Sequence, residues 1–177
     1  MADRTVAGLR ASIKSLKDTV APAVDPANPL ASEQLRMVCG YLALVCEQLP
    51  QRAARIVFEL RSAVALAEAL RPLAARCDAT IAAELQARCD AARRLQDDPD
   101  RIETEVERAT EALNAATSAL VRAAATADEA VRQEVERITL AHARHWLTVQ
   151  RAWFAPLGFD LERATLPPLP DALRAAG

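Results

Sequence analysis

Two histidines on one predicted helix are the residues whose types and spacing could carry chemistry. His142 and His145 are the chain's 2 histidines, and both fall in the apolar pattern of a helix expected to end near Phe154. Positions three apart on a helix differ by about 60° in direction, so both side chains are expected to point into the protein. Neutral imidazoles in such a place could bind a metal or haem iron, or act as acid and base. The other interpretation is that each histidine bonds a neighbouring group and fixes the packing, and this is the one we predict.

The spacings typical of metal and catalytic sites are missing around these histidines. Di-iron helical proteins supply Glu-x-x-His pairs, but Thr139 stands three residues before His142. A zinc or iron centre also wants a third and usually a fourth protein ligand. The 4 cysteines show no CxxC spacing, and we interpret them as reduced thiols. Only Cys39 joins the histidines as a weak metal candidate, so no metal and no cofactor is predicted.

Aromatic residues gather on the same helix and just after it. Trp146 and Trp153 lie seven residues apart, with Phe154 and Phe159 close behind. Such a cluster either forms a local part of the core or lines a pocket for an apolar ligand. In the second case the pocket would lie between this helix and an earlier one, and its candidate residues are Tyr41, His142, His145, Trp146 and Trp153.

The composition predicts that helices position all of these residues. Of 177 residues, 51% are hydrophobic but only 3% are aromatic and only 4 are glycines. Alanine and leucine dominate, and they lose the least free energy on entering a helix. The net charge of −2 gives no global field that would attract nucleic acid or an anionic membrane. We therefore predict an all-α protein that binds neither.

Residues 30–49 are predicted to form the central helix of a five- or six-helix, up-down-like bundle. Apolar residues recur there at alternating steps of three and four, which places them on one face. Met37 and Tyr41 add apolar surface on another side, so neighbouring helices are expected to surround this one. Replacing Leu42 by alanine should then cost about 2–5 kcal/mol. The predicted seam comprises Leu35, Val38, Leu42, Val45 and Leu49.

Prolines and capping residues predict where the helices end. A first helix is expected over residues 3–21, and Ser32 is expected to cap the central helix. Breaks are expected at Pro72, which cannot donate a backbone hydrogen bond, and at Thr126, whose spacing to Glu129 suits a capping box. The proline-rich tail, residues 155–177, is expected to lie along the bundle. Together these segments predict one domain over residues 1–177.

The apolar seams, without a complete catalytic set, favour a non-enzymatic interaction or assembly protein. A homodimer or accessory subunit is the expected form, because two-fold association is the commonest way to bury a spare apolar face. The alternative is a bundle that binds a small molecule or cofactor, or an enzyme, using the aromatic and histidine face of the last helix. The start of the chain shows no signal peptide, which predicts the cytoplasm, and the 20 arginines against 2 lysines suggest a bacterium. The sequence names no partner or ligand.

Overall fold

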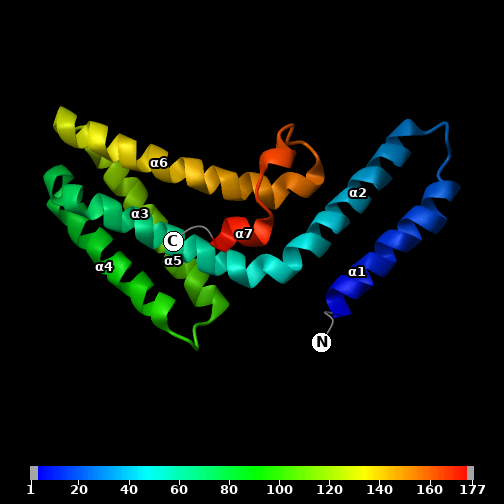
Figure 1. Ribbon diagram of the computed structural model, residues 1–177, viewed down its shortest axis with the longest axis horizontal. Helices are drawn as coiled ribbons and strands as arrows, with labels where there is room; N and C mark the ends of the chain where they lie inside the picture. Colours follow the sequence, from blue (N-terminus) through cyan, green and yellow to red (C-terminus); the bar gives the residue numbers. More distant parts are fainter. Residues whose placement is uncertain (1–3, 175–177) are drawn as a thin grey trace. The chain divides into compact units, whose positions relative to one another are not determined.

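The computed structural model describes residues 4–174, and every regular element in that range is helical (Figure 1). This confirms the prediction of an all-α protein. A π-helical turn, Leu16–Val20, prolongs the first helix, and short 3₁₀ turns lie at Ala21–Ala23, Leu49–Gln51, Ala155–Leu157 and Arg163–Thr165. The α-helices are α1 Arg4–Ser15, α2 Pro29–Gln48, α3 Arg52–Cys77, α4 Ala79–Asp97, α5 Glu103–Ala124, α6 Glu129–Phe154 and α7 Leu169–Arg174.

The described chain divides into two compact units. The α1–α2 unit comprises residues 4–52 and 151–166, and the α3–α6 unit comprises residues 53–150 and 167–174. The expectations of a single domain, and of a bundle covered by its tail, remain predictions. Within residues 4–174, no helix has both the length and the apolar character needed to cross a bilayer.

Four helices of the α3–α6 unit share one hydrophobic core. Alanines such as Ala67, Ala74 and Ala92 are completely or almost completely buried in it, so the helices approach closely with little bulk between them. The alanine-rich composition therefore determines how this unit packs. The larger fully buried members come from all four helices: Leu60, Leu70, Leu85, Leu113, Leu120, Val131 and Val135.

The prediction that residues 30–49 form a helix is confirmed to within one residue at each end, but the predicted buried seam is wrong. Only Cys39, Leu44 and Cys46 of α2 are buried, and none of them belongs to the predicted seam. Within its unit α2 is contacted by α1 and by the turns Leu16–Val20, Leu49–Gln51 and Ala155–Leu157, and several of its large apolar side chains remain exposed. Periodicity showed that the apolar residues share one side of the helix, but it could not show which side neighbouring segments would cover.

The predicted break at Pro72 is also wrong, because α3 continues through this proline to Cys77. Leu70 and Ala74 on either side are fully buried, and their packing holds the helix against the core although proline disfavours it. Pro72 itself is on the exposed side, where water can solvate the carbonyl that loses its partner. The break falls instead at Asp78, whose carboxylate accepts from the Thr80 and Ile81 amides at 2.7 and 2.9 Å.

The break near Thr126 is confirmed, but two of the predicted caps are wrong. The cap of α6 is Asp128, whose Oδ1 accepts from the Val131 amide at 3.0 Å. Asp128 also pairs with Arg76 at 3.0 Å, which joins the start of α6 to the end of α3. The cap of α2 is Asn28, which accepts from the Ala31 amide at 3.1 Å, rather than Ser32. In both places the cap is the Asp or Asn residue immediately before the helix, since its short side chain suits a cap well.

Candidate functional site

The α3–α6 unit holds His142 against a buried serine. Nε2 of His142 lies 3.3 Å from Oγ of Ser62 on α3. Burial lowers the pKa of His142 below its ordinary value, and the positive charge of neighbouring His145 lowers it further. A serine next to a histidine is also the arrangement of a nucleophile and its base. Ser62 is only 5% exposed, so a substrate could not reach its hydroxyl, and the pair is better explained as packing.

His145 and Trp146 cover the ring of Phe58. The Phe58 ring lies 5.5 Å from the Trp146 ring in a stacked geometry and 6.2 Å from the His145 ring in a tilted one. Phe58 is 1% exposed, whereas His145 is an exposed residue. The expectation that both histidines point into the interior is therefore wrong for His145. Its 60° offset places it at the edge of the contact with α3, where it shields Phe58 from water.

The remaining candidates, Tyr41 and Trp153, belong to the α1–α2 unit. Tyr41 is exposed on α2, and the Trp153 carbonyl accepts from the Gln48 amide at 3.2 Å. The structure thus brings His145 and Trp146 together on Phe58 and joins His142 to Ser62. A pocket formed by all five candidates remains a prediction.

Two of the cysteines, Cys77 and Cys89, have the surroundings of inert thiols. All 4 are free, and three of them are buried. Burial raises the pKa of both Cys77 and Cys89, which opposes the thiolate form needed for nucleophilic attack or metal binding. Among residues 4–174, no group of three or more His, Cys, Asp or Glu side chains is placed to hold a metal ion.

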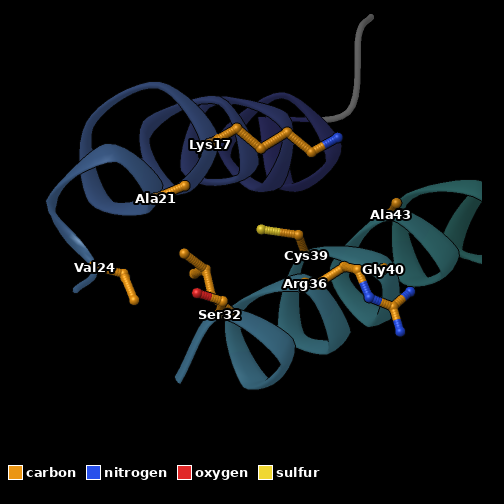
Figure 2. Close-up of a pocket in the computed structure, with 9 residues that line it drawn as sticks. Lys17, Ala21, Val24, Ser32, Arg36, Cys39, Gly40 and Ala43 are labelled. Atoms are coloured by element: carbon orange, nitrogen blue, oxygen red, sulfur yellow. The ribbon is translucent and has the colours of Figure 1, made fainter. Parts of the chain in front are cut away.

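A groove of about 470 Å³ lies between α2 and the segment after α1, residues 17–24. The Cys39 thiol projects from α2 toward this segment, with Arg36 at the rim of the groove (Figure 2). Arg36 is already paired with Glu33 through two hydrogen bonds of 2.9 and 2.5 Å. The groove is open because its walls are largely small side chains, and it is lined by Lys17, Ala21, Val24, Ser32, Leu35, Arg36, Cys39, Gly40 and Ala43.

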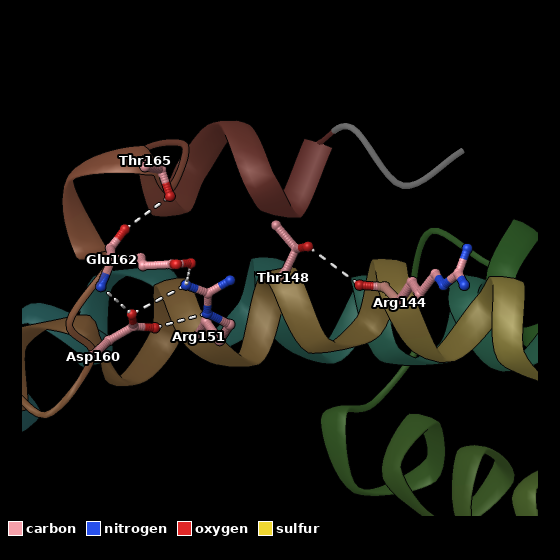
Figure 3. A network of polar contacts seen from close by, with 6 residues as sticks. All are labelled: Arg144, Thr148, Arg151, Asp160, Glu162 and Thr165. Carbon is pink, nitrogen blue, oxygen red and sulfur yellow. Dashed lines mark hydrogen bonds and ion pairs between the residues drawn. The ribbon is translucent and has the colours of Figure 1, made fainter.

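The loop after α6 is held by a polar cluster around Arg151. The Arg151 guanidinium binds both carboxylate oxygens of Asp160, at 2.8 and 3.1 Å, and reaches Glu162 at 3.4 Å (Figure 3). The Glu162 amide donates to Asp160 at 2.9 Å, and the Thr165 hydroxyl donates to the Glu162 carbonyl at 2.8 Å. The hydrogen bond from Arg151 lowers the pKa of Asp160, so the carboxylate stays charged and this cluster, the Arg151 clamp, stays closed at neutral pH.

The clamp leaves two large apolar side chains in water. Phe159 is 84% exposed and Leu161 is 99% exposed. Gly158 precedes them at φ 79°, a conformation that glycine adopts most readily. Arg151 holds Asp160 through two hydrogen bonds, and the side chains on either side of Asp160 are left exposed. These two side chains of the tail are therefore not part of a packed interior.

The comparisons with known proteins identify no relative. No protein-family model matches the chain, and neither a curated protein nor a solved structure matches it.

Sequence reasoning missed both the groove and the exposed loop. Gly40 and Ala43 are small residues three apart on α2, a spacing that could have indicated an open helix contact. Arg151 and Asp160 are nine residues apart across Pro156 and Gly158, and such a pair around a turn could have suggested the clamp. Neither signal reveals which apolar residues remain uncovered.

The pH dependence of stability is expected to come partly from His142. The unfolded chain, with a histidine pKa of about 6.5, binds more protons just below that value than the folded chain does, because the folded pKa is lower. Stability should therefore fall as the pH drops from about 6.5 toward the folded pKa, and stay level above that window. Urea melts between about pH 8 and 5.5 should show a flatter profile for His142→Gln. His145→Gln is the matched control, and an equal flattening in both variants would contradict the assignment to His142.

Proposed function

We propose that the protein acts by association, as a non-enzymatic interaction or assembly protein that forms a homodimer. One observation carries the proposal: α2 exposes a row of large apolar side chains, here named the α2 stripe. Its members are Leu30, Met37, Val38 and Tyr41, exposed by 68, 56, 48 and 62%. Leu30, Met37 and Tyr41 follow one another at steps of seven and four, so they lie along one side of the helix.

A stripe of this kind is more than scattered surface hydrophobicity. Single exposed apolar residues are common, but contiguous apolar rows on a helix mark surfaces that bind another protein. A central tyrosine and methionine also suit an interface, where these types are enriched. A second copy is the simplest partner, because two-fold pairing buries the same stripe on both subunits.

The proposal also includes the expected cellular location and the expected packing of the tail. We take the protein to work in a bacterial cytoplasm, where its 4 cysteines stay reduced. We take its helices to form one bundle on which the proline-rich tail packs. The burial of Ala172 and Leu173 in α7, and the 2.8 Å hydrogen bond from Arg61 to the Leu173 carbonyl, support the second expectation.

Charge placed in the stripe is expected to abolish the association. A Met37→Glu/Tyr41→Glu variant should behave as a monomer in light scattering at tens of micromolar, because each dimer would have to bury four unpaired carboxylates. Both positions are exposed, so the monomer should keep its helical circular dichroism. The matched control is Leu140→Glu/Leu147→Glu, at two equally exposed positions of α6. Equal mass for stripe and control variants would contradict a role of the stripe.

The groove between α2 and residues 17–24 supports a second candidate function, the binding of a small apolar molecule. Its volume of about 470 Å³ falls within the roughly 300–1,000 Å³ typical of ligand pockets. Filling it with Ala43→Trp should remove the binding of an apolar fluorescent dye, while Leu140→Trp should not. Dye binding that is the same in both variants would contradict a ligand in this groove.

A further inference from the structure

We propose that the α2 stripe of one copy is covered by the Phe159–Leu161 loop of a second copy. In this dimer the two α2 helices run antiparallel about a two-fold axis, and each copy contributes both a stripe and a loop. The inference rests on the proposed function and adds the surface that the stripe meets.

At its carboxyl end the α2 stripe continues into Gln48, which another segment of the same chain already covers. Gln48 lies seven residues after Tyr41 and eleven after Met37, and both spacings return to the same side of a helix within about 20°. The Gln48 amide donates to the Trp153 carbonyl at 3.2 Å, and the turn Ala155–Leu157 contacts α2. The carboxyl end of this side is therefore occupied by the segment that leads into the loop, whereas the amino-terminal half is open.

A two-fold axis across α2 places the covered carboxyl end of each helix beside the open amino-terminal half of the other. In an antiparallel arrangement the carboxyl end of one helix, with its loop, lies beside the open half of the other helix. Figure 1 shows α1 and the loop on opposite sides of α2, so α1 does not stand between the paired helices. A parallel pair would set loop against loop and leave the stripes without this cover.

Hydrogen bonds within one copy preorganise the loop for such a contact. The two hydrogen bonds from Arg151 to Asp160, and those that fix Glu162, hold the backbone on both sides of Leu161. Little conformational freedom is then lost on binding, which is the principal advantage of a preorganised surface. A clamped loop that holds Phe159 and Leu161 in water therefore has the properties of an interface anchor.

The exposed apolar area of the stripe and the loop is about the area that a stable dimer interface buries. The six side chains of one copy, four in the stripe and two in the loop, are exposed by between 48 and 99%. At roughly 200 Å² for a large apolar residue they offer on the order of 800 Å². A standard interface buries about 800 Å² from each partner.

A photocrosslinker placed at position 161 tests the arrangement directly. Full-length protein with p-benzoylphenylalanine in place of Leu161 is mixed, unlabelled with ¹⁵N-labelled, and irradiated. We expect mixed-isotope crosslinks from position 161 of one copy to residues 37–41 of the other. Crosslinks between copies that map to other segments would overturn the loop-to-stripe contact while leaving the homodimer intact.

Affinity provides the second measurement. Phe159→Ser/Leu161→Ser should weaken the dimer by at least about 100-fold, since each buried apolar side chain is worth roughly a factor of ten. The matched control Leu140→Ser/Leu147→Ser removes similar apolar groups from α6 and should leave the dissociation constant unchanged. A dimer unaffected by the loop variant overturns this inference alone, whereas a monomeric wild-type chain overturns the proposed function as well.

Discussion

Replacing Phe58 by alanine is expected to lower the free energy of unfolding by about 3–5 kcal/mol. Phe58 is 1% exposed, and its ring is covered by Trp146 and His145. Truncation removes the apolar contacts and leaves a cavity that two aromatic neighbours cannot easily fill. Urea denaturation followed by tryptophan fluorescence measures the loss and also reports the changed surroundings of Trp146.

The matched control is an exposed position of α6, in the helix that carries Trp146. Leu140→Ala, at a residue that is 61% exposed, should change the free energy of unfolding by less than about 1 kcal/mol. A loss below about 1 kcal/mol for Phe58→Ala would show that this ring is not part of the packed interior of the α3–α6 unit.

Leu85→Ala is expected to lower the free energy of unfolding by about 2–5 kcal/mol, and Leu42→Ala by less than half of that amount. Leu85 is fully buried among the four helices of the α3–α6 unit, whereas Leu42 on α2 is only half-buried. The same substitution therefore removes a complete set of contacts in one place and a partial set in the other. Parallel urea melts of the two variants compare them directly. A greater loss at Leu42 would restore α2 as the centre of the fold.

The helices themselves were largely predictable from the sequence. The helix over residues 30–49 and the break near Thr126 follow from local residue types, and the structure has both. The predictions that are wrong share a cause, because the true structure in each place depends on contacts between residues distant in sequence. Pro72 lies inside α3 because Leu70 and Ala74 are held by the core. Met37, Val38 and Tyr41 of α2 are exposed because the contacts from α1, Leu16–Val20 and Ala155–Leu157 do not cover them.

The candidate site was predictable only in part, for a similar reason. The partly buried position of His142 follows from its place in the apolar pattern, and burial there lowers its pKa. His145 shares that pattern but lies one step around the helix, which is enough to expose it. Phe159 and Leu161 resembled core residues by type, and only the turn of Asp160 toward Arg151 shows why they face outward.

Sedimentation equilibrium of the unmodified full-length chain tests the central claim, that the protein self-associates through its exposed apolar surface. Measured across concentrations up to tens of micromolar, the average mass should rise to twice the chain mass and fit a monomer–dimer equilibrium. The same run on Met37→Glu/Tyr41→Glu should give the chain mass throughout. A wild-type protein that keeps the chain mass at every concentration would contradict the account.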